Sequence, residues 1–309
     1  MNTLVLGGNG FIGSHLVDRL LREGHAVHVF DRQPERYRKP LAGVVYHMQD
    51  FGNRAFLASV LPQMDMVFHL VSTTVPKTSN DDPAFDVMSN MVETIYLLEQ
   101  CAKERVKKFV FVSSGGAVYG TPAALPVPED SPEKPESSYG IIKLAIEKYL
   151  GLFHRLYGLN YVVLRPSNPY GERQNPDGDQ GVIAVFLGRI AKGRAIDIWG
   201  DGSNVKDYVY IEDMIEGMYR AAFSDTVHRV FNMGSGIGHS VSDIVRRISE
   251  KVDRPISVNY LPQGAFDVSR IYLDITRARK ELGWEPRISL DEGLQRTWEF
   301  VKNPGSLHE

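Results

Sequence analysis

A tyrosine and a lysine four residues apart, Tyr139 and Lys143, have the clearest potential for acid–base chemistry in this 309-residue chain. Residues at this spacing share one face of a helix. A phenol is a poor base at neutral pH because its ordinary pKa is about 10, but a nearby ammonium group lowers that pKa. The pair therefore predicts a group that takes a proton from a hydroxyl and returns it. The spacing alone is common, and the alternative is an ordinary surface tyrosine.

Glycines near the N-terminus have the spacing of a phosphate-binding turn. The apolar run 4–6 ends in Gly7, and Gly10 and Gly13 follow before a helix-like stretch at 14–22. Gly7 permits a tight turn, Gly10 lets the backbone approach a pyrophosphate, and Gly13 lets the helix pack close to the strand. The helix N-terminus adds free N–H groups and a partial positive charge.

An acidic residue follows at the distance expected of a ribose-binding group. A second apolar run, 26–30, ends in Asp31, eighteen residues after Gly13. Together these features predict a unit that binds a dinucleotide. The alternative is a strand–helix–strand unit whose glycines serve packing alone.

The elements that position these residues alternate between strand-like and helix-like segments. Strands are predicted at 3–7, 26–30, 44–48, 66–71, 108–113 and 161–165, and helices at 11–22, 53–62, 84–104 and 138–157. Several strands are unbroken apolar runs, which suit a parallel sheet covered on both faces. The pattern predicts an α/β fold with a doubly wound parallel sheet of the Rossmann type.

The residue composition changes after Pro166, where proline, glycine, asparagine and aspartate become frequent. A strand at 208–211, a helix at 213–223 and a strand at 229–232 are expected to return to the sheet. We therefore expect a nucleotide-binding domain of residues 1–166 plus about 206–233. The remainder, about 167–205 plus 234–309, is expected to form a smaller mixed α/β lobe that binds substrate.

Composition excludes several classes of protein. The formal net charge of −3 argues against a nucleic-acid surface. A single cysteine, Cys101, allows neither an internal disulfide nor a multi-cysteine metal site. The nine histidines lack metal-ligand spacing, so no metal is expected. Without a long apolar run or a leader-like N-terminus, we expect a cytoplasmic protein that spans no membrane.

The longer motifs resemble those of the extended short-chain dehydrogenase/reductases, in the branch that acts on nucleotide sugars. The resemblance is greatest to the 4-epimerases of UDP-glucose and UDP-N-acetylglucosamine. It covers nearly the whole chain through GGNGFIG at 7–13, FVSSGGAVYG at 111–120, YGIIK at 139–143, LRPSNPYG at 164–171, WGDGSNVKDYVYIEDM at 199–214, FNMGSG at 231–236 and LGWEP at 282–286.

The resemblance implies NAD as the cofactor. Asp31 would bind the adenosine ribose and favour NAD, although Arg32 leaves NADP open because an arginine there could accept a 2′-phosphate. Lys143 would hold the nicotinamide ribose, next to Tyr139. The other residues implied to contact the cofactor are Gly7, Gly10, Phe11, Ile12, Gly13, Asp50, Phe51, Leu70, Val71, Ser72, Asn90 and Pro166.

For the nucleotide sugar, the resemblance implies contacts from Asn168, Val182, Ile183, Lys206 and Arg270. Lys206 stands where the family usually has arginine, so it keeps the charge but loses the bidentate geometry. Arg270 is the better candidate for a bidentate contact with the diphosphate. The alternative for both cations is a solvated surface charge.

One position departs from the family pattern. The usual catalytic serine or threonine falls at Gly115, so Ser114 is the nearest hydroxyl and our candidate. Thr73 and Thr74 are possible substitutes. The run from Gly115 to Ala117 also lacks the carboxylate with which nucleotide-sugar dehydratases move protons, which argues against dehydration.

These observations predict 4-epimerisation of a UDP-hexose or UDP-N-acetylhexosamine through a 4-keto intermediate, with Tyr139 as the acid/base. The alternatives are a nucleotide-sugar 4-keto reductase, a dehydratase, or a non-catalytic NAD-binding sensor on the same fold. The resemblance also implies a homodimer formed through the helices predicted at 84–104 and 138–157.

Overall fold

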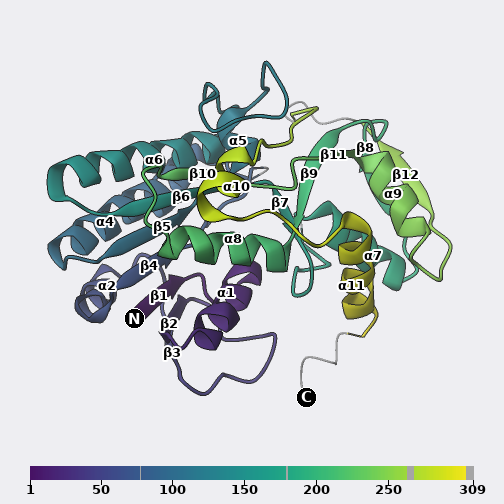
Figure 1. Cartoon of the computed structure of the whole chain (residues 1–309). Helices are drawn as coiled ribbons and strands as arrows, with labels where there is room; N and C mark the ends of the chain where they lie inside the picture. Colours follow the sequence, from purple (N-terminus) through teal and green to yellow (C-terminus); the bar gives the residue numbers. More distant parts are fainter. Residues whose placement is uncertain (77, 179, 263–267, 304–309) are drawn as a thin grey trace.

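A seven-stranded parallel sheet forms the centre of the molecule (Figure 1), in a computed structural model that describes residues 1–76, 78–178, 180–262 and 268–303. The strand order is β10-β6-β5-β4-β1-β2-β3. The strands are β1 (Asn2–Leu6), β2 (Ala26–Asp31), β3 (Val44–Met48), β4 (Met66–His69), β5 (Lys108–Val112), β6 (Tyr161–Pro166) and β10 (Val230–Met233). The predicted doubly wound parallel sheet is therefore confirmed.

The strand order reverses next to β1. The chain runs outward from β1 through β2 to β3, and then crosses to β4 on the other side of β1. In open α/β sheets of this kind, ligands bind beyond the carboxyl ends of the strands at such a reversal. The turns after β1 and β4 are therefore the expected place for a ligand.

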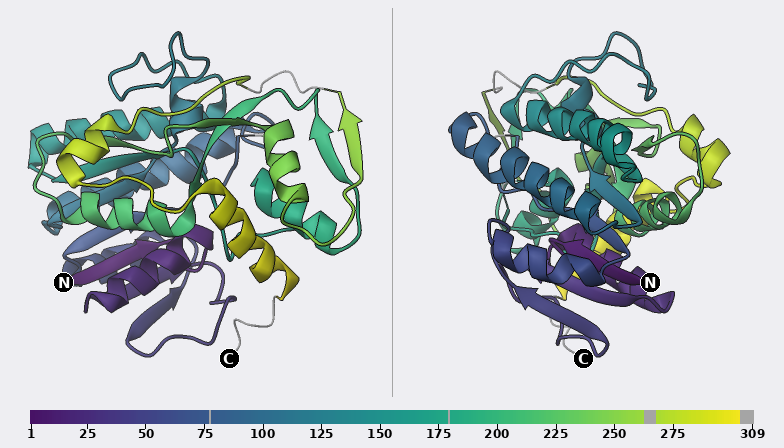
Figure 2. Two further views of the ribbon diagram at one scale, coloured as in Figure 1. Left: turned by 45° about the vertical axis from the view of Figure 1, so that its right-hand side comes forward. Right: turned by 90° about the vertical axis from the view of Figure 1, so that its left-hand side faces the viewer.

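Helices cover both faces of the sheet (Figure 2). On one face lie α2 (Arg54–Val60), α4 (Glu93–Lys103) and α6 (Ser138–Tyr157), and on the other lie α1 (Phe11–Arg22) and α8 (Ile211–Phe223). Leu4 and Leu6 pack in the apolar cluster beneath α2, α4 and α6, whereas Val5 packs in the apolar cluster beneath α1 and α8. Because successive strand residues face opposite sides, this double cover explains the unbroken apolar runs.

The helix predicted over 84–104 is interrupted. It consists of α3 (Pro83–Asp86), a π-helical segment η2 (Val87–Val92) and α4. The helix predicted over 53–62 likewise ends early in α2 and continues as a 3₁₀ turn, η1 (Leu61–Gln63). A short helix not predicted from the sequence, α5 (Gly115–Tyr119), follows β5.

The smaller lobe contains two short sheets. One has the order β11-β9-β7 and the other pairs β12 with β8. Its strands are β7 (Asn168–Tyr170), β8 (Ile196–Trp199), β9 (Val205–Tyr210), β11 (Gly238–Ser240) and β12 (Val258–Leu261). The remaining helices are α7 (Val182–Ala191), α9 (Val241–Ser249), α10 (Thr276–Leu282) and α11 (Leu290–Lys302).

One predicted return to the large sheet is wrong. The strand expected over 208–211 forms as β9, but it pairs with β7 and β11. The edge of β6 is instead paired with β10, as expected for 229–232. Beyond Pro166 the chain turns directly into β7, which gives β9 a partner outside the large sheet.

No helix in the described ranges is long and apolar enough to cross a membrane. Within those ranges there is also no group of three or more histidine, cysteine, aspartate or glutamate side chains able to hold a metal ion.

Candidate active site

The turn after β1 restricts side chains at its glycines, each for a different reason. Gly7 has a φ of +82°, in the left-handed region that favours glycine. A Cβ at Gly10 would lie 3.2 Å from the Gly7 carbonyl oxygen, and one at Gly13 would lie 2.1 Å from the same atom. The first turn of α1, with its unsatisfied N–H groups, therefore lies directly against this bare backbone, as an anion-binding turn requires.

Asp31 lies beside this turn at the end of β2. Its carboxylate accepts hydrogen bonds from the backbone N–H groups of Asn9 (3.0 Å) and Gln33 (3.0 Å). The neighbouring Arg32 side chain is exposed. The amide oxygen of Asn9 is buried without a hydrogen-bond partner among the described residues. This edge of the turn thus offers a carboxylate, a cation and an unused acceptor to a ligand.

The chain after β4 lies against the same turn. A Cβ at Gly7 would be 3.4 Å from the Val71 amide nitrogen and 3.5 Å from the Leu70 carbonyl carbon. Phe51 is buried against His69, with ring centroids 5.1 Å apart, whereas Asp50 and Ser72 are exposed. Residues predicted from separate motifs therefore converge on one edge of the sheet.

Lys143 is buried in α6 behind Tyr139. Its Nζ donates a hydrogen bond to the Val112 carbonyl (3.0 Å) and lies 4.9 Å from the Phe111 ring centroid and 5.5 Å from the Tyr139 ring centroid. Burial lowers the pKa of Lys143 to about 8, although Asp86 and Glu147 oppose that shift.

Two influences oppose the lowering of the Tyr139 pKa that is predicted from Lys143. Burial and the nearby charge of Asp86 raise the pKa of Tyr139 to about 12, whereas Ser114 opposes the shift. The ammonium group of Lys143 is hydrogen-bonded to the Val112 carbonyl and lies 5.5 Å from the Tyr139 ring centroid. Asp86 also adds a negative charge that disfavours the phenolate.

Ser114 provides the hydroxyl beside Tyr139. Its side chain caps α5 by accepting from the Ala117 N–H (3.3 Å), and its hydroxyl lowers the pKa of Tyr139. Position 115 is crowded: a Cβ there would lie 2.7 Å from Leu273 Cδ1 and 3.1 Å from the Pro166 carbonyl oxygen, so a larger residue requires Leu273 to move. The chain thus has its hydroxyl one residue before the position of the family pattern.

Asn90 lies within the π-helical segment and is tied to the loop after β4. Its Oδ1 accepts from the Thr73 N–H (2.9 Å), and its Nδ2 donates to Thr73 Oγ1 (2.7 Å) and to Asp86 Oδ1 (2.8 Å). Thr74 donates its own hydroxyl proton to Asp86 Oδ1 (2.6 Å). Since that proton is committed, Thr74 can serve a ligand only as an acceptor.

Asp86 is the residue of this region that the sequence did not single out. On a regular helix over 84–104 it would lie opposite the apolar side chains at 88, 92 and 95, so no pattern in the sequence pointed to it. The side chain is 1% exposed. Buried carboxylates need partners, so its burial indicates a polar site nearby.

The residues predicted to bind the nucleotide sugar gather around β7 and β9. Asn168, on β7, donates to the Asp207 carbonyl of β9 (2.8 Å). Lys206 donates to the Val268 carbonyl (2.5 Å), and Arg270 is exposed and bridged to Val205. Two weaker candidates lie at the start of α7. Val182 packs partly exposed against the core, and Ile183 is 1% exposed in the core, which removes its side chain from ligand contact.

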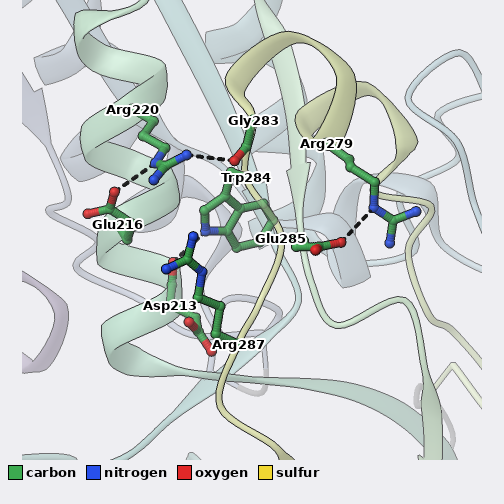
Figure 3. A pocket seen from close by; sticks show the side chains of 8 residues that line it. All are labelled: Asp213, Glu216, Arg220, Arg279, Gly283, Trp284, Glu285 and Arg287. Carbon is green, nitrogen blue, oxygen red and sulfur yellow. Dashed lines mark hydrogen bonds and ion pairs between the residues drawn. The ribbon is translucent and has the colours of Figure 1, made fainter.

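A hollow between α8 and α10 lies apart from all these residues (Figure 3). Its charged side chains are largely paired with each other, as in Arg220–Glu216 (2.7 Å) and Arg279–Glu285 (2.9 Å). Trp284 donates its indole N–H to the Asp213 carbonyl (2.8 Å). The contacts of the residues around this hollow therefore attach the C-terminal segment to α8.

Comparison with known proteins shows the family to which the chain is similar. The sequence pattern of the NAD dependent epimerase/dehydratase family matches residues 3–234. A UDP-glucose 4-epimerase from Mycolicibacterium smegmatis is 39% identical, over 98% of this chain and 99% of the other.

Two solved structures have the same fold over nearly their whole length. A UDP-glucose 4-epimerase from Thermotoga maritima with UDP-glucose superposes with a TM-score of 0.93 at 38% identity, covering 98% of this chain and 99% of the other. The UDP-glucose 4-epimerase of Thermus thermophilus in complex with NAD superposes with a TM-score of 0.92 at 33% identity, with the same coverage.

Proposed function

The chain belongs to the NAD-dependent epimerase/dehydratase family, and from that premise we propose that it interconverts the C4 epimers of a UDP-hexose or UDP-N-acetylhexosamine. The observation that carries the proposal is the buried Lys143 ammonium group, which is bonded to the Val112 carbonyl and lies 5.5 Å from the Tyr139 ring centroid. The length-wide similarity to UDP-glucose 4-epimerases supports the choice of substrate class.

The residues around the glycine turn fit NAD. The missing side chain at Gly13 lets α1 pack against the turn, the missing side chain at Gly10 leaves its backbone bare for a pyrophosphate at the N-terminus of α1, and Asn9 has a buried acceptor without a partner among the described residues. Asp31 would accept from the ribose hydroxyls, and Lys143 would hold the nicotinamide ribose. When bound, NAD would supply the hydride acceptor and donor that inversion at C4 requires.

The protein's own part in the reaction is proton transfer and positioning. Tyr139 takes the proton of the C4 hydroxyl. It returns the proton after the keto sugar has rotated in the site and presented its other face. Ser114 hydrogen-bonds to the same oxygen and orients it. The positive charge of Lys143 favours the phenolate once Lys143 also contacts the ribose. Asn168, Lys206 and Arg270 would hold the diphosphate while the sugar moves.

The alternatives differ in what they consume. A 4-keto reductase uses one reduced cofactor for each sugar, whereas an epimerase uses none. Gly115, Gly116 and Ala117 offer no carboxylate to a dehydratase. A sensor binds NAD without turnover, but the paired Tyr139 and Lys143 have no evident purpose in such a protein.

The test is to incubate the purified chain with UDP-glucose, UDP-galactose and their N-acetyl forms without added cofactor. We expect one pair to reach its C4 equilibrium, and NAD to be released when the protein is denatured. Failure to interconvert any UDP-sugar would contradict the proposal. Stoichiometric consumption of added NADH or NADPH would instead identify a reductase.

A second copy of this chain is the proposed partner. Phe85, Met88 and Ile141 are more than half exposed, and they lie on α3, η2 and α6, which pack side by side. An apolar patch on adjacent helices favours a helix-to-helix interface. The proposed homodimer would therefore bury the helices that carry Asn90 and Tyr139.

A further inference from the structure

The buried carboxylate of Asp86 joins three segments of the candidate active site. Its Oδ1 accepts from the Thr74 hydroxyl (2.6 Å) and from the Asn90 amide (2.8 Å), and its Oδ2 accepts from the Ser138 hydroxyl (2.8 Å). All three donors are neutral. In the described ranges, no lysine or arginine lies within ion-pair distance of this carboxylate.

One of these contacts fixes the start of the helix that carries the acid/base. Ser138 immediately precedes Tyr139, and its backbone N–H also donates to Asn80 Oδ1 (2.9 Å). The Tyr139 N–H donates to the Ser79 hydroxyl (3.1 Å). The first turn of α6 is thus attached to the loop after β4 and to the end of α3.

The other contacts fix the opposite side of the site. Thr74 and Asn90 lie where the cofactor and sugar are expected, and Asn90 is held in turn by Thr94 and His69. Thr94 donates its hydroxyl proton to the Asn90 carbonyl (2.6 Å), so His69 Nε2 must donate to Thr94 (2.8 Å). A continuous buried network therefore runs from β4 to α6 with Asp86 as its charged member.

The charge of Asp86 acts on both catalytic groups. It raises the pKa of Tyr139 and opposes the burial that lowers the pKa of Lys143. Glu147 acts on Lys143 in the same direction, and Lys143 in turn lowers the pKa of His69. Of these groups, Asp86 alone also has a hydrogen-bonded connection to the turn that carries Tyr139.

We propose that Asp86 is a positioning residue of the catalytic centre, which holds Tyr139 at a fixed place relative to Thr74 and Asn90. The proposal rests on the proposed epimerase function for its kinetic consequence. The effect of the same carboxylate on the titration of Lys143 can be measured without substrate.

The kinetic test replaces Asp86 with asparagine, which preserves size but removes the charge. We expect kcat to fall about 10- to 100-fold with KM little changed, because misplaced groups lose rate without losing contacts to the substrate. Both limbs of the kcat pH profile should move to lower pH, since the pKa values of Tyr139 and Lys143 both fall. Asp82→Asn is the matched control, because Asp82 is an exposed cap four residues earlier on the same segment.

The second test needs no turnover. The Lys143 side chain is followed by NMR in protein labelled with ¹³C at lysine Cε, and its signal is assigned with Lys143→Arg. We expect Asp86→Asn to lower the pKa of Lys143, from about 8, by about 1 unit. Thermal unfolding of each variant checks that it is folded.

The two tests separate the two proposals. An unchanged Lys143 titration together with kcat within about twofold of wild type would overturn the role of Asp86. A wild-type chain without epimerase activity, but with a Lys143 pKa that falls in Asp86→Asn, would overturn the function alone.

Discussion

At the residue scale, Tyr139 has the buried ammonium group of Lys143 5.5 Å from its ring centroid, and Ser114 lowers its pKa. Tyr139→Phe removes the proton carrier and leaves the glycine turn intact. We expect kcat to fall about 10³-fold, within the range for loss of a general acid/base, while NAD content stays at the wild-type level. Steady-state interconversion and NAD released per chain measure the two quantities.

The matched control is Tyr157→Phe, at the exposed end of the same helix. It should keep full activity. Near-wild-type turnover of Tyr139→Phe would assign the proton transfer to another group.

The position of the catalytic hydroxyl gives a second prediction. Ser114→Ala should lower kcat about 10-fold through loss of a hydrogen bond to the reacting oxygen. Adding Gly115→Ser should not restore it, because Leu273 Cδ1 occupies the space of the new Cβ. Restored activity in the double variant, or full activity in Ser114→Ala, would show that the serine at 114 is not required.

The sequence predicted Tyr139, Lys143 and the glycine turn because each belongs to a pattern with fixed spacing. Ser114 could be proposed only as the nearest hydroxyl, since the obstacle at position 115 comes from Leu273, far away in the chain. Asp86 belongs to no short motif. Its role depends on contacts with Thr74 and Ser138, which only the folded chain brings together.

At the element scale, Asp207 of β9 joins three parts of the smaller lobe. Its buried carboxylate accepts from the Ser235 N–H (2.7 Å), the Ser235 hydroxyl (2.6 Å) and the Leu273 N–H (3.1 Å). Asp207→Ala would leave these donors without an acceptor and should destabilise the protein by about 3 kcal/mol. Urea unfolding gives the free energy of unfolding.

Asp253→Ala removes an exposed carboxylate and should change the free energy of unfolding by less than about 0.5 kcal/mol. Equal effects of the two substitutions would mean that Asp207 does not hold these segments together.

The helices and strands were predicted most accurately where a single pattern in the sequence determined the type of element. Unbroken apolar runs correctly predicted the central strands, since only a strand covered on both faces is apolar throughout. The pairing of β9 could not be predicted, because its apolar residues suit either sheet and its partner β7 has only three residues. The π-helical segment also has no periodic signature, and it occurs where Asn90 contacts the loop after β4.

At the scale of the whole molecule, His69 makes stability depend on pH. Burial holds the pKa of His69 at about 3, so it stays neutral in the folded chain, whereas the unfolded chain takes up a proton near pH 6.5. The contribution of neutral His69 to the free energy of unfolding is therefore fully present above pH 6.5 and is lost as the pH falls toward 3. The slope is about 1.4 kcal/mol for each pH unit.

His69→Gln, which keeps a donor for Thr94, should reduce the loss of stability between pH 7 and pH 5 by about 2 kcal/mol. Urea unfolding of both proteins at the two pH values measures the difference. Parallel pH dependence in variant and wild type would contradict the assignment.

The proposed dimer gives a prediction for the assembly. Met88→Glu combined with Ile141→Glu places charges in the apolar patch and should convert a dimer into a monomer, as measured by light scattering after gel filtration. Val227→Glu changes an even more exposed apolar residue elsewhere and should leave the mass unchanged. A monomeric wild type would exclude the proposed interface.

The pairing of β10 with β6 has a consequence for the order of synthesis. The outer edge of β6 is covered only by a strand that the ribosome produces after β7, α7, β8, β9 and α8. A nascent chain released at Pro166 would expose a row of unpaired N–H and C=O groups along an apolar strand, the kind of edge on which chains aggregate. Premature termination in this region should therefore yield insoluble fragments rather than a free nucleotide-binding domain.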